Sequence, residues 1–213
     1  MILKPAMGLL SLLFKDPVTF VLLVIPLLYS IIIHEVAHGW VANKMGDPTA
    51  KWLGRLTLDP RKHLDPLGTI MLFLAGFGWA KPVPVNFNNL RSPRKGLIFV
   101  SAAGITANIV LAFISLLTLR LLHLPPFGEV TTMLFYVARI NIMLAAFNLI
   151  PIPPLDGSKI LMGFTSRRFQ YSLARLEPYG FFIIIGLLWL GFLDPVINFL
   201  EWAILQLLSL VVP

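Results

Sequence analysis

The stretch HEVAH, residues 34–38, places three ionisable side chains within five positions. On a helix, residues four apart stack on one face, so the imidazoles of His34 and His38 can reach a single metal ion. Glu35 lies next to His34 and can act as general base toward a water molecule. A zinc ion lowers the pKa of the water that it binds to about 7. The spacing therefore predicts hydrolysis assisted by one Zn²⁺ ion.

A catalytic zinc site takes three protein ligands and leaves a fourth position open. The chain has no cysteine, so the third ligand must be His, Asp or Glu. The candidates are His63, Asp65, His123, Asp156, Glu177 and Glu201. We favour Asp156, because the prolines of NLIPIPPLDG break a helix there, and non-helical backbone at membrane depth must be buried or line a wet cavity. The alternative is an ordinary Asp-Gly turn.

The elements that position these residues are apolar. Of the 213 residues, 57% are hydrophobic and 13% are charged, and the mean hydropathy is +0.84. Soluble domains are roughly half apolar and a quarter charged. We expect an all-α integral membrane protein with about five to six membrane helices, folded as a single domain over residues 1–213.

The HEVAH stretch ends the first long apolar run, which starts at Val18 and stops before Gly46. At 1.5 Å per residue, a helix entering at Val18 leaves a core of about 30 Å near residue 38. Further helices are expected over 96–122 and 130–150 and in a C-terminal pair over 180–212. Residues 66–77 are too short to span, so we expect 66–90 to form a re-entrant helix followed by a returning β-hairpin segment.

The basic residues predict the orientation. If residues 66–90 are re-entrant, 13 of the 17 Lys and Arg fall on the side of the HEVAH stretch. Cytoplasmic loops are rich in Lys and Arg, so we expect the site near the cytosolic side of a prokaryotic plasma membrane, with membrane lipids as partners. The net charge of +7 does not indicate nucleic acid, since no basic stretch is interleaved with stacking aromatics.

Arg139 falls in the middle of a predicted span, where a charge is costly. We expect it to form a structural ion pair with Glu129 or Glu177 rather than to act in catalysis.

Several motifs together resemble the site-2 protease family of intramembrane zinc metalloproteases. They are HEVAHGWVANKMGD, TAKWLGRLTLDPRKHLDP, GWAKPVPVN, SAAGITAN and NLIPIPPLDG, in matching order over residues 18–165. The family usually has proline after the glycine of SAAGITAN, whereas Ile105 stands here. Since neither a PDZ domain nor a CBS pair is recognisable, the chain resembles a minimal member.

The resemblance implies that His34, His38 and Asp156 bind zinc and that Glu35 is the catalytic base. It also implies that Asn148 faces the site and contacts substrate or the developing oxyanion. Lys81–Asn86 matches a re-entrant strand region that pairs with unwound substrate in the family. The implied function is hydrolysis of peptide bonds within or next to transmembrane helices of membrane proteins.

The alternating stretch VPVNF, residues 83–87, suits an edge strand because of its proline. An edge strand can satisfy an unwound backbone by β-augmentation, so Val83, Val85 and Asn86 are predicted to bind the substrate. The alternative is a hairpin without substrate contact. For the whole chain, the alternative function is a membrane metal carrier that uses the same His/His/Asp site without hydrolysis.

Overall fold

The computed structural model describes residues 9–75, 78–126 and 128–211, and these contain α-helices and short 3₁₀ turns but no strand. The helices are α1 Leu9–Lys15, α2 Pro17–Lys44, α3 Thr49–Trp52, α4 Pro66–Ala75, α5 Pro93–Leu122, α6 Glu129–Leu149, α7 Asp156–Phe164, α8 Arg167–Ala174, α9 Gly180–Trp189 and α10 Asp194–Ser209. This confirms the all-α prediction. The expected short helix at 66–77 is α4 as far as Ala75, and its last two positions lie outside the described residues.

Four stretches of the described chain are long and apolar enough to cross a membrane, namely α2, α5, α6 and the run from Arg167 to Trp189 that joins α8 to α9. Helix α10 has 16 residues, fewer than a typical span of about 20. The protein is therefore an integral membrane protein, and the higher count of five to six membrane helices stays a prediction.

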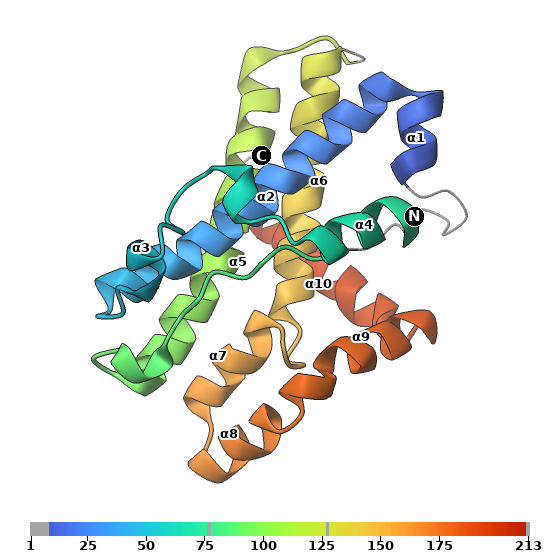
Figure 1. The fold of residues 1–213 in the computed structure, drawn as a ribbon. Helices are drawn as coiled ribbons and strands as arrows, with labels where there is room; N and C mark the ends of the chain where they lie inside the picture. The colour runs from blue at the N-terminus through green and yellow to red at the C-terminus, as the bar shows by residue number, and fades with distance from the viewer. Residues whose placement is uncertain (1–8, 76–77, 127, 212–213) are drawn as a thin grey trace.

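Helices α2, α5 and α6 cross one another at the centre of the molecule (Figure 1). Helix α5 packs against α2, α6 and α7, and α10 packs against α6. Ala112 of α5 and Ala145 and Ala146 of α6 are fully buried in the shared apolar core. Small residues let helix backbones approach closely, which is how helices associate in a membrane.

The segment between α4 and α5 returns beside the point that it left. Ala80 forms a single antiparallel bridge with Leu64, and the Lys81 N–H donates to the His63 carbonyl at 2.8 Å. The expected hairpin goes no further, because Pro82 and Pro84 have no N–H to donate to a ladder. Residues 81–86 form neither helix nor strand, and re-entry into the membrane stays a prediction.

Asp47, just past the end of α2, fixes the other end of this segment. Its buried carboxylate accepts from the Asn86 N–H at 2.7 Å and from the Asn89 amide at 3.0 Å, and it also accepts from the Thr49 hydroxyl. Burial favours a raised pKa for Asp47, but the hydrogen bonds from Thr49, Asn89 and Asn86 outweigh it and lower the pKa below its ordinary value. The carboxylate is therefore charged at neutral pH and holds the segment against α2.

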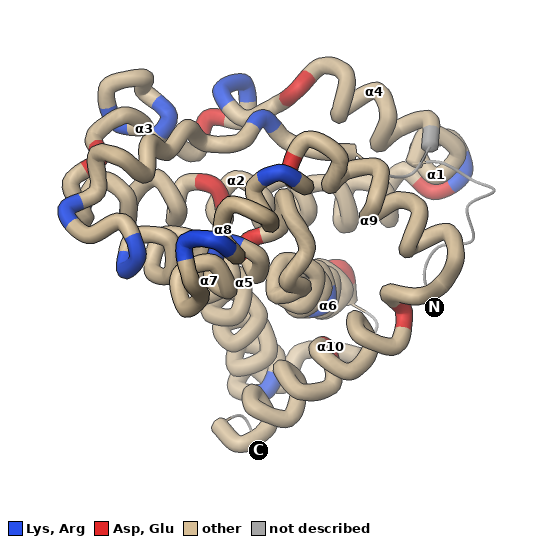
Figure 2. The backbone as a smooth tube through the Cα atoms, turned by 90° about the horizontal axis from the view of Figure 1, so that it is seen from below, with Lys and Arg blue, Asp and Glu red and all other residues tan. Residues whose placement is uncertain are grey.

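Arg139 does pair, but not with the partners that the sequence suggested. Its guanidinium lies 2.8 Å from the Glu201 carboxylate on α10. The expectation of Glu129 or Glu177 is wrong because α10, which carries Glu201, packs directly against α6. Elsewhere, Lys and Arg gather over α3 and α8 (Figure 2).

Candidate metal centre

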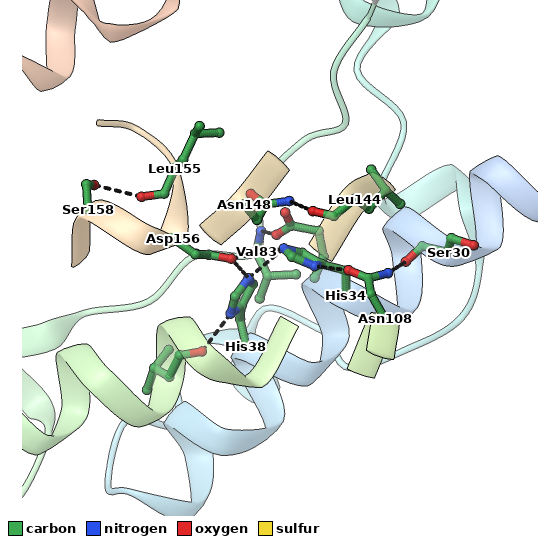
Figure 3. Close-up of polar contacts among 12 residues, drawn as sticks. Ser30, His34, His38, Val83, Asn108, Leu144, Asn148, Leu155, Asp156 and Ser158 are labelled. Atoms are coloured by element: carbon green, nitrogen blue, oxygen red, sulfur yellow. Dashed lines mark hydrogen bonds and ion pairs between the residues drawn. The ribbon is translucent and has the colours of Figure 1, made fainter. Parts of the chain in front are cut away.

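Two helices bring the predicted ligands together. His34 and His38 lie one turn apart on α2, and Asp156 is the first residue of α7. The Nε2 atoms of the two histidines are 3.0 Å apart, and each lies 3.1 Å from Oδ2 of Asp156 (Figure 3). All three side chains are buried. The Pro-rich break after α6 is what turns Asp156 back toward α2.

The opposite ring nitrogens determine which tautomer each histidine adopts. Nδ1 of His34 lies 2.6 Å from the Asn108 side-chain oxygen, and Nδ1 of His38 lies 2.7 Å from the Val100 carbonyl. Both partners are acceptors, so each Nδ1 carries the hydrogen and each Nε2 presents a lone pair. Both lone pairs point at the same small volume as the Asp156 carboxylate.

This donor set fits a divalent cation. Ligand atoms of His34, His38 and Asp156 all lie within 4.8 Å of one another. Oδ2 of Asp156 is buried and has no hydrogen-bond partner among the described residues. Three acceptor atoms without a hydrogen between them repel one another, and a cation removes that repulsion. Two histidines and one carboxylate match the ligand set of catalytic zinc sites.

Two glycines make room for these ligands. A Cβ on Gly104 of α5 would lie 2.5 Å from His38 Nε2 and 2.6 Å from His34 Nε2. A Cβ on Gly157, directly after Asp156, would lie 2.2 Å from the Leu149 carbonyl oxygen. These distances are too short for any side chain, so the close approach of α5 to the histidines and of α7 to the end of α6 requires glycine at both positions.

A buried polar network supports His34 from behind. The Asn108 amide donates to Asn141 Oδ1 at 2.7 Å, and the Asn141 amide donates to the Ser30 hydroxyl at 2.7 Å and to the Val137 carbonyl at 2.8 Å. These bonds fix which end of Asn108 faces His34. Neither Ser30 nor Asn141 was predicted to have a function, although polar side chains inside apolar runs are a usable signal of a functional site.

Glu35 is bound to the segment between α4 and α5. Its Oε2 accepts from the Val83 N–H at 2.7 Å, and the side chain is partly buried. Its other carboxylate oxygen has no hydrogen-bond partner in the described part of the chain and is free to take a proton.

The predicted substrate-binding residues lie in different settings. Val83 is buried, and Asn86 is exposed with its N–H bound to Asp47. The Val85 N–H has no acceptor among the described residues. Asn148 lies beside the ligands, and its amide donates to the Leu144 carbonyl of its own helix at 3.0 Å (Figure 3).

The other candidates for the third ligand do not join the cluster. Among the described residues, only His34, His38 and Asp156 form a group that could hold a metal ion. His63 is buried elsewhere, with Nε2 2.8 Å from the Thr57 carbonyl. The Glu201 carboxylate forms an ion pair with Arg139 instead.

Comparison with known proteins agrees with this site. The model of peptidase family M50 matches residues 122–191. "Putative zinc metalloprotease YwhC" of Bacillus subtilis is 42% identical over 191 residues, which cover 86% of this chain and 85% of that protein. The chain belongs to peptidase family M50. This peptidase is also 35% identical to "Putative zinc metalloprotease Rip2" of Mycobacterium tuberculosis, over 84% of the chain and 69% of the relative.

A more distant relative of this M50 peptidase is "Zinc metalloprotease MJ0392" of Methanocaldococcus jannaschii, 24% identical over 74% of the chain and 38% of the relative. No solved structure matches the chain. The family confirms the predicted resemblance to site-2 proteases and the predicted metalloprotease activity, and it favours both over the metal carrier.

Proposed function

We propose that this protein is an intramembrane zinc metalloendopeptidase that cuts peptide bonds within or next to the transmembrane helices of protein substrates. The observation that carries the proposal is the convergence of His34, His38 and Asp156 beside Glu35 at the end of an apolar helix. The three would hold one zinc ion, which supplies Lewis acidity that polarises a carbonyl and acidifies water.

Glu35 performs the proton transfers. One oxygen of its carboxylate is held by the Val83 N–H, which leaves the other oxygen to accept a proton from the attacking water. The same carboxylic acid then protonates the leaving amine. Asn148 uses one amide hydrogen within its helix, and the second donates to the oxyanion, a contribution of about 3 kcal/mol at comparable sites.

A peptide bond within a substrate helix must first be unwound. Its freed N–H and C=O groups then need partners, since the membrane core offers no bulk water. Residues 83–86 form neither helix nor strand, Val83 bonds to Glu35, and the Val85 N–H has no acceptor among the described residues. Val83, Val85 and Asn86 therefore bind the unwound substrate along this segment, with Val85 donating to a substrate carbonyl.

The orientation follows from charge. Lys and Arg gather over α3 and α8, near the end of α2 that carries the histidines, and so we place the site near the cytosolic side of a prokaryotic plasma membrane. Arg167 and Arg168, at the start of α8, are exposed and contact anionic lipid headgroups there.

The proposed activity is tested with purified wild-type protein and Glu35→Gln, each incubated with a panel of transmembrane peptides. Gln cannot take a proton but leaves all three ligands in place. We expect Glu35→Gln to keep one zinc ion per chain and to lose at least about 1,000-fold in cleavage rate, since it lacks the general base and part of the charge at the site. Cleavage of the peptides by both proteins at equal rates would remove Glu35 from the base role.

A further inference from the structure

Arg55 is a buried cation that the reaction described above does not use. It lies in the connector between α3 and α4, and 7% of its surface is exposed. No carboxylate among the described residues forms an ion pair with it, and its Nε is buried without a hydrogen-bond partner. Burying a charge without a carboxylate partner costs stability. We therefore expect the hydrogen bonds that Arg55 does make to have a function other than stabilising the fold.

Those contacts lead to the catalytic base. Nη2 of Arg55 donates to the Lys81 carbonyl at 2.8 Å and to the Pro82 carbonyl at 3.2 Å. The Pro82 carbonyl belongs to the same peptide unit as the Val83 N–H, and that N–H donates to Glu35 at 2.7 Å. One planar peptide thus links the guanidinium to the carboxylate. A cation on the carbonyl side polarises the unit and strengthens the N–H as a donor.

The surrounding packing leaves this peptide little freedom. A Cβ on Gly39, one residue after His38, would lie 2.7 Å from Leu56 and 2.8 Å from Val83. The residue after Arg55 and the residue that holds Glu35 therefore both pack directly on α2. Three parts of the chain meet at Gly39: the connector between α3 and α4, the segment between α4 and α5, and helix α2.

We propose that Arg55 is a positioning residue for Glu35, acting through the Pro82–Val83 peptide. Arg55 fixes the plane of the peptide, the peptide fixes one oxygen of Glu35, and the other oxygen is thereby aimed at the attacking water. The Val83 N–H belongs to the backbone, so replacing the Val83 side chain does not remove it, and proline at this position would change the backbone conformation. Replacing Arg55 therefore offers a way to alter the bond between Val83 and Glu35. The inference rests on the proposed role of Glu35 as base.

The sequence Pro82-Val83-Pro84 allows the contact to be measured without catalysis. Prolines have no amide hydrogen, so Val83 supplies the only exchangeable one in the three residues. Hydrogen exchange at this amide, resolved to the single residue in the full-length protein in micelles, reports the bond to Glu35. Glu35→Ala removes the acceptor and gives the exchange rate of the unprotected amide.

We expect Arg55→Gln to speed Val83 exchange toward the Glu35→Ala value and to lower kcat about 10- to 100-fold, the scale of one hydrogen bond to a charged group. Zinc content should stay at one ion per chain, and KM should change much less than kcat. The matched control is Arg61→Gln in the same connector. Arg61 is exposed and paired with Asp59, and its replacement should leave exchange and kcat at wild-type values.

Wild-type exchange at Val83 in Arg55→Gln, or lost protection with an unchanged kcat, would overturn the proposal. A change in KM or in zinc content alone in Arg55→Gln, with kcat unchanged, would also overturn it, because such a change is expected of a residue with only a structural role. If Arg55→Gln does not fold, Arg55→Met replaces it: a thioether fills similar apolar space but cannot donate to either carbonyl, so wild-type exchange and kcat there would also refute the role. A wild-type protein that cuts no peptide counts against the proposed function, whereas Val83 exchange still tests Arg55.

Discussion

His34 is oriented by a side chain on another helix. Asn108 of α5 accepts from Nδ1, and its own orientation is fixed by Asn141 of α6. The tautomer of one proposed metal ligand therefore depends on a chain of hydrogen bonds through three helices. Such outer partners of a ligating histidine raise its basicity and hold its ring in place.

Asn108→Leu tests this support. Leucine fills similar volume but cannot accept the Nδ1 hydrogen, so His34 is free to rotate or to change tautomer. We expect zinc affinity, measured by competition with a chelator, to fall about 10- to 100-fold while the protein stays folded. Thr118→Val is the control on the same helix, because the half-buried Thr118 bonds, among the described residues, only to Ile114 of its own helix. Equal affinities in the two variants would show that Asn108 does not support the ligand.

The residues of the centre differ in how well sequence could find them. His34, Glu35 and His38 follow from the period of one helix, and Asp156 follows from the proline break that precedes it. Arg55 could not be assigned, since its hydrogen bonds to Lys81 and Pro82 join positions more than 20 residues apart in the chain. Pairings of that kind depend on how helices pack, which local spacing does not encode.

At the scale of elements, the segment between α4 and α5 is held at both ends and open in the middle. Arg55 and His63 bind its start, and Asp47 binds Asn86 and Asn89 at its end. The Val85 N–H lies between these two attachments without a partner among the described residues. An extended substrate needs such an uncommitted donor.

Val85→Pro removes that donor while keeping an extended backbone. If Val85 binds unwound substrate, kcat/KM toward transmembrane peptides should fall about tenfold, the worth of one hydrogen bond, with zinc content unchanged. Val85→Ala keeps the N–H and serves as the control, so its kcat/KM should stay near that of wild type. Identical cleavage by Val85→Pro and wild type would exclude the predicted pairing.

The boundaries of the long helices were predictable because their start and stop signals are local. Asp16 caps α2 by accepting from the Thr19 N–H at 3.0 Å, and Gly46 follows its end with φ of 113°. The predicted hairpin is not confirmed, since the described residues contain one isolated bridge and no strand. Alternation of side chains indicates extended backbone but does not say whether a partner strand is present. Pro82 and Pro84 are compatible with extended backbone but prevent regular pairing with a partner strand, since they have no N–H to donate.

Across the whole molecule, Arg139 and Glu201 join α10 to the central helices. The glutamate side chain is 10% exposed and that of the arginine is 48% exposed. Apolar contacts alone hold helices together weakly in lipid, so a charge pair between α6 and α10 adds a specific attachment.

The pair is tested by a double-mutant cycle. Arg139→Met and Glu201→Leu each leave one charge without its partner, so each should lower the free energy of unfolding by about 2 kcal/mol. This value is smaller than that expected for a fully buried pair, because Arg139 is half-exposed. The double variant should lose less than the sum of the two. Unfolding by SDS titration in mixed micelles measures all four proteins. Strict additivity would mean that the pair contributes no coupling.

Gly104 and Gly157 carry no functional group, yet the metal centre cannot form without the space they leave. A methyl group at Gly104 would push α5 away from the histidines, and one at Gly157 would push the start of α7, with Asp156, away from the end of α6. In a comparison of natural variants, or in a library built on this chain, these two positions should tolerate as little change as the ligands themselves. The smallest side chains thus define how tightly three helices can close around one ion.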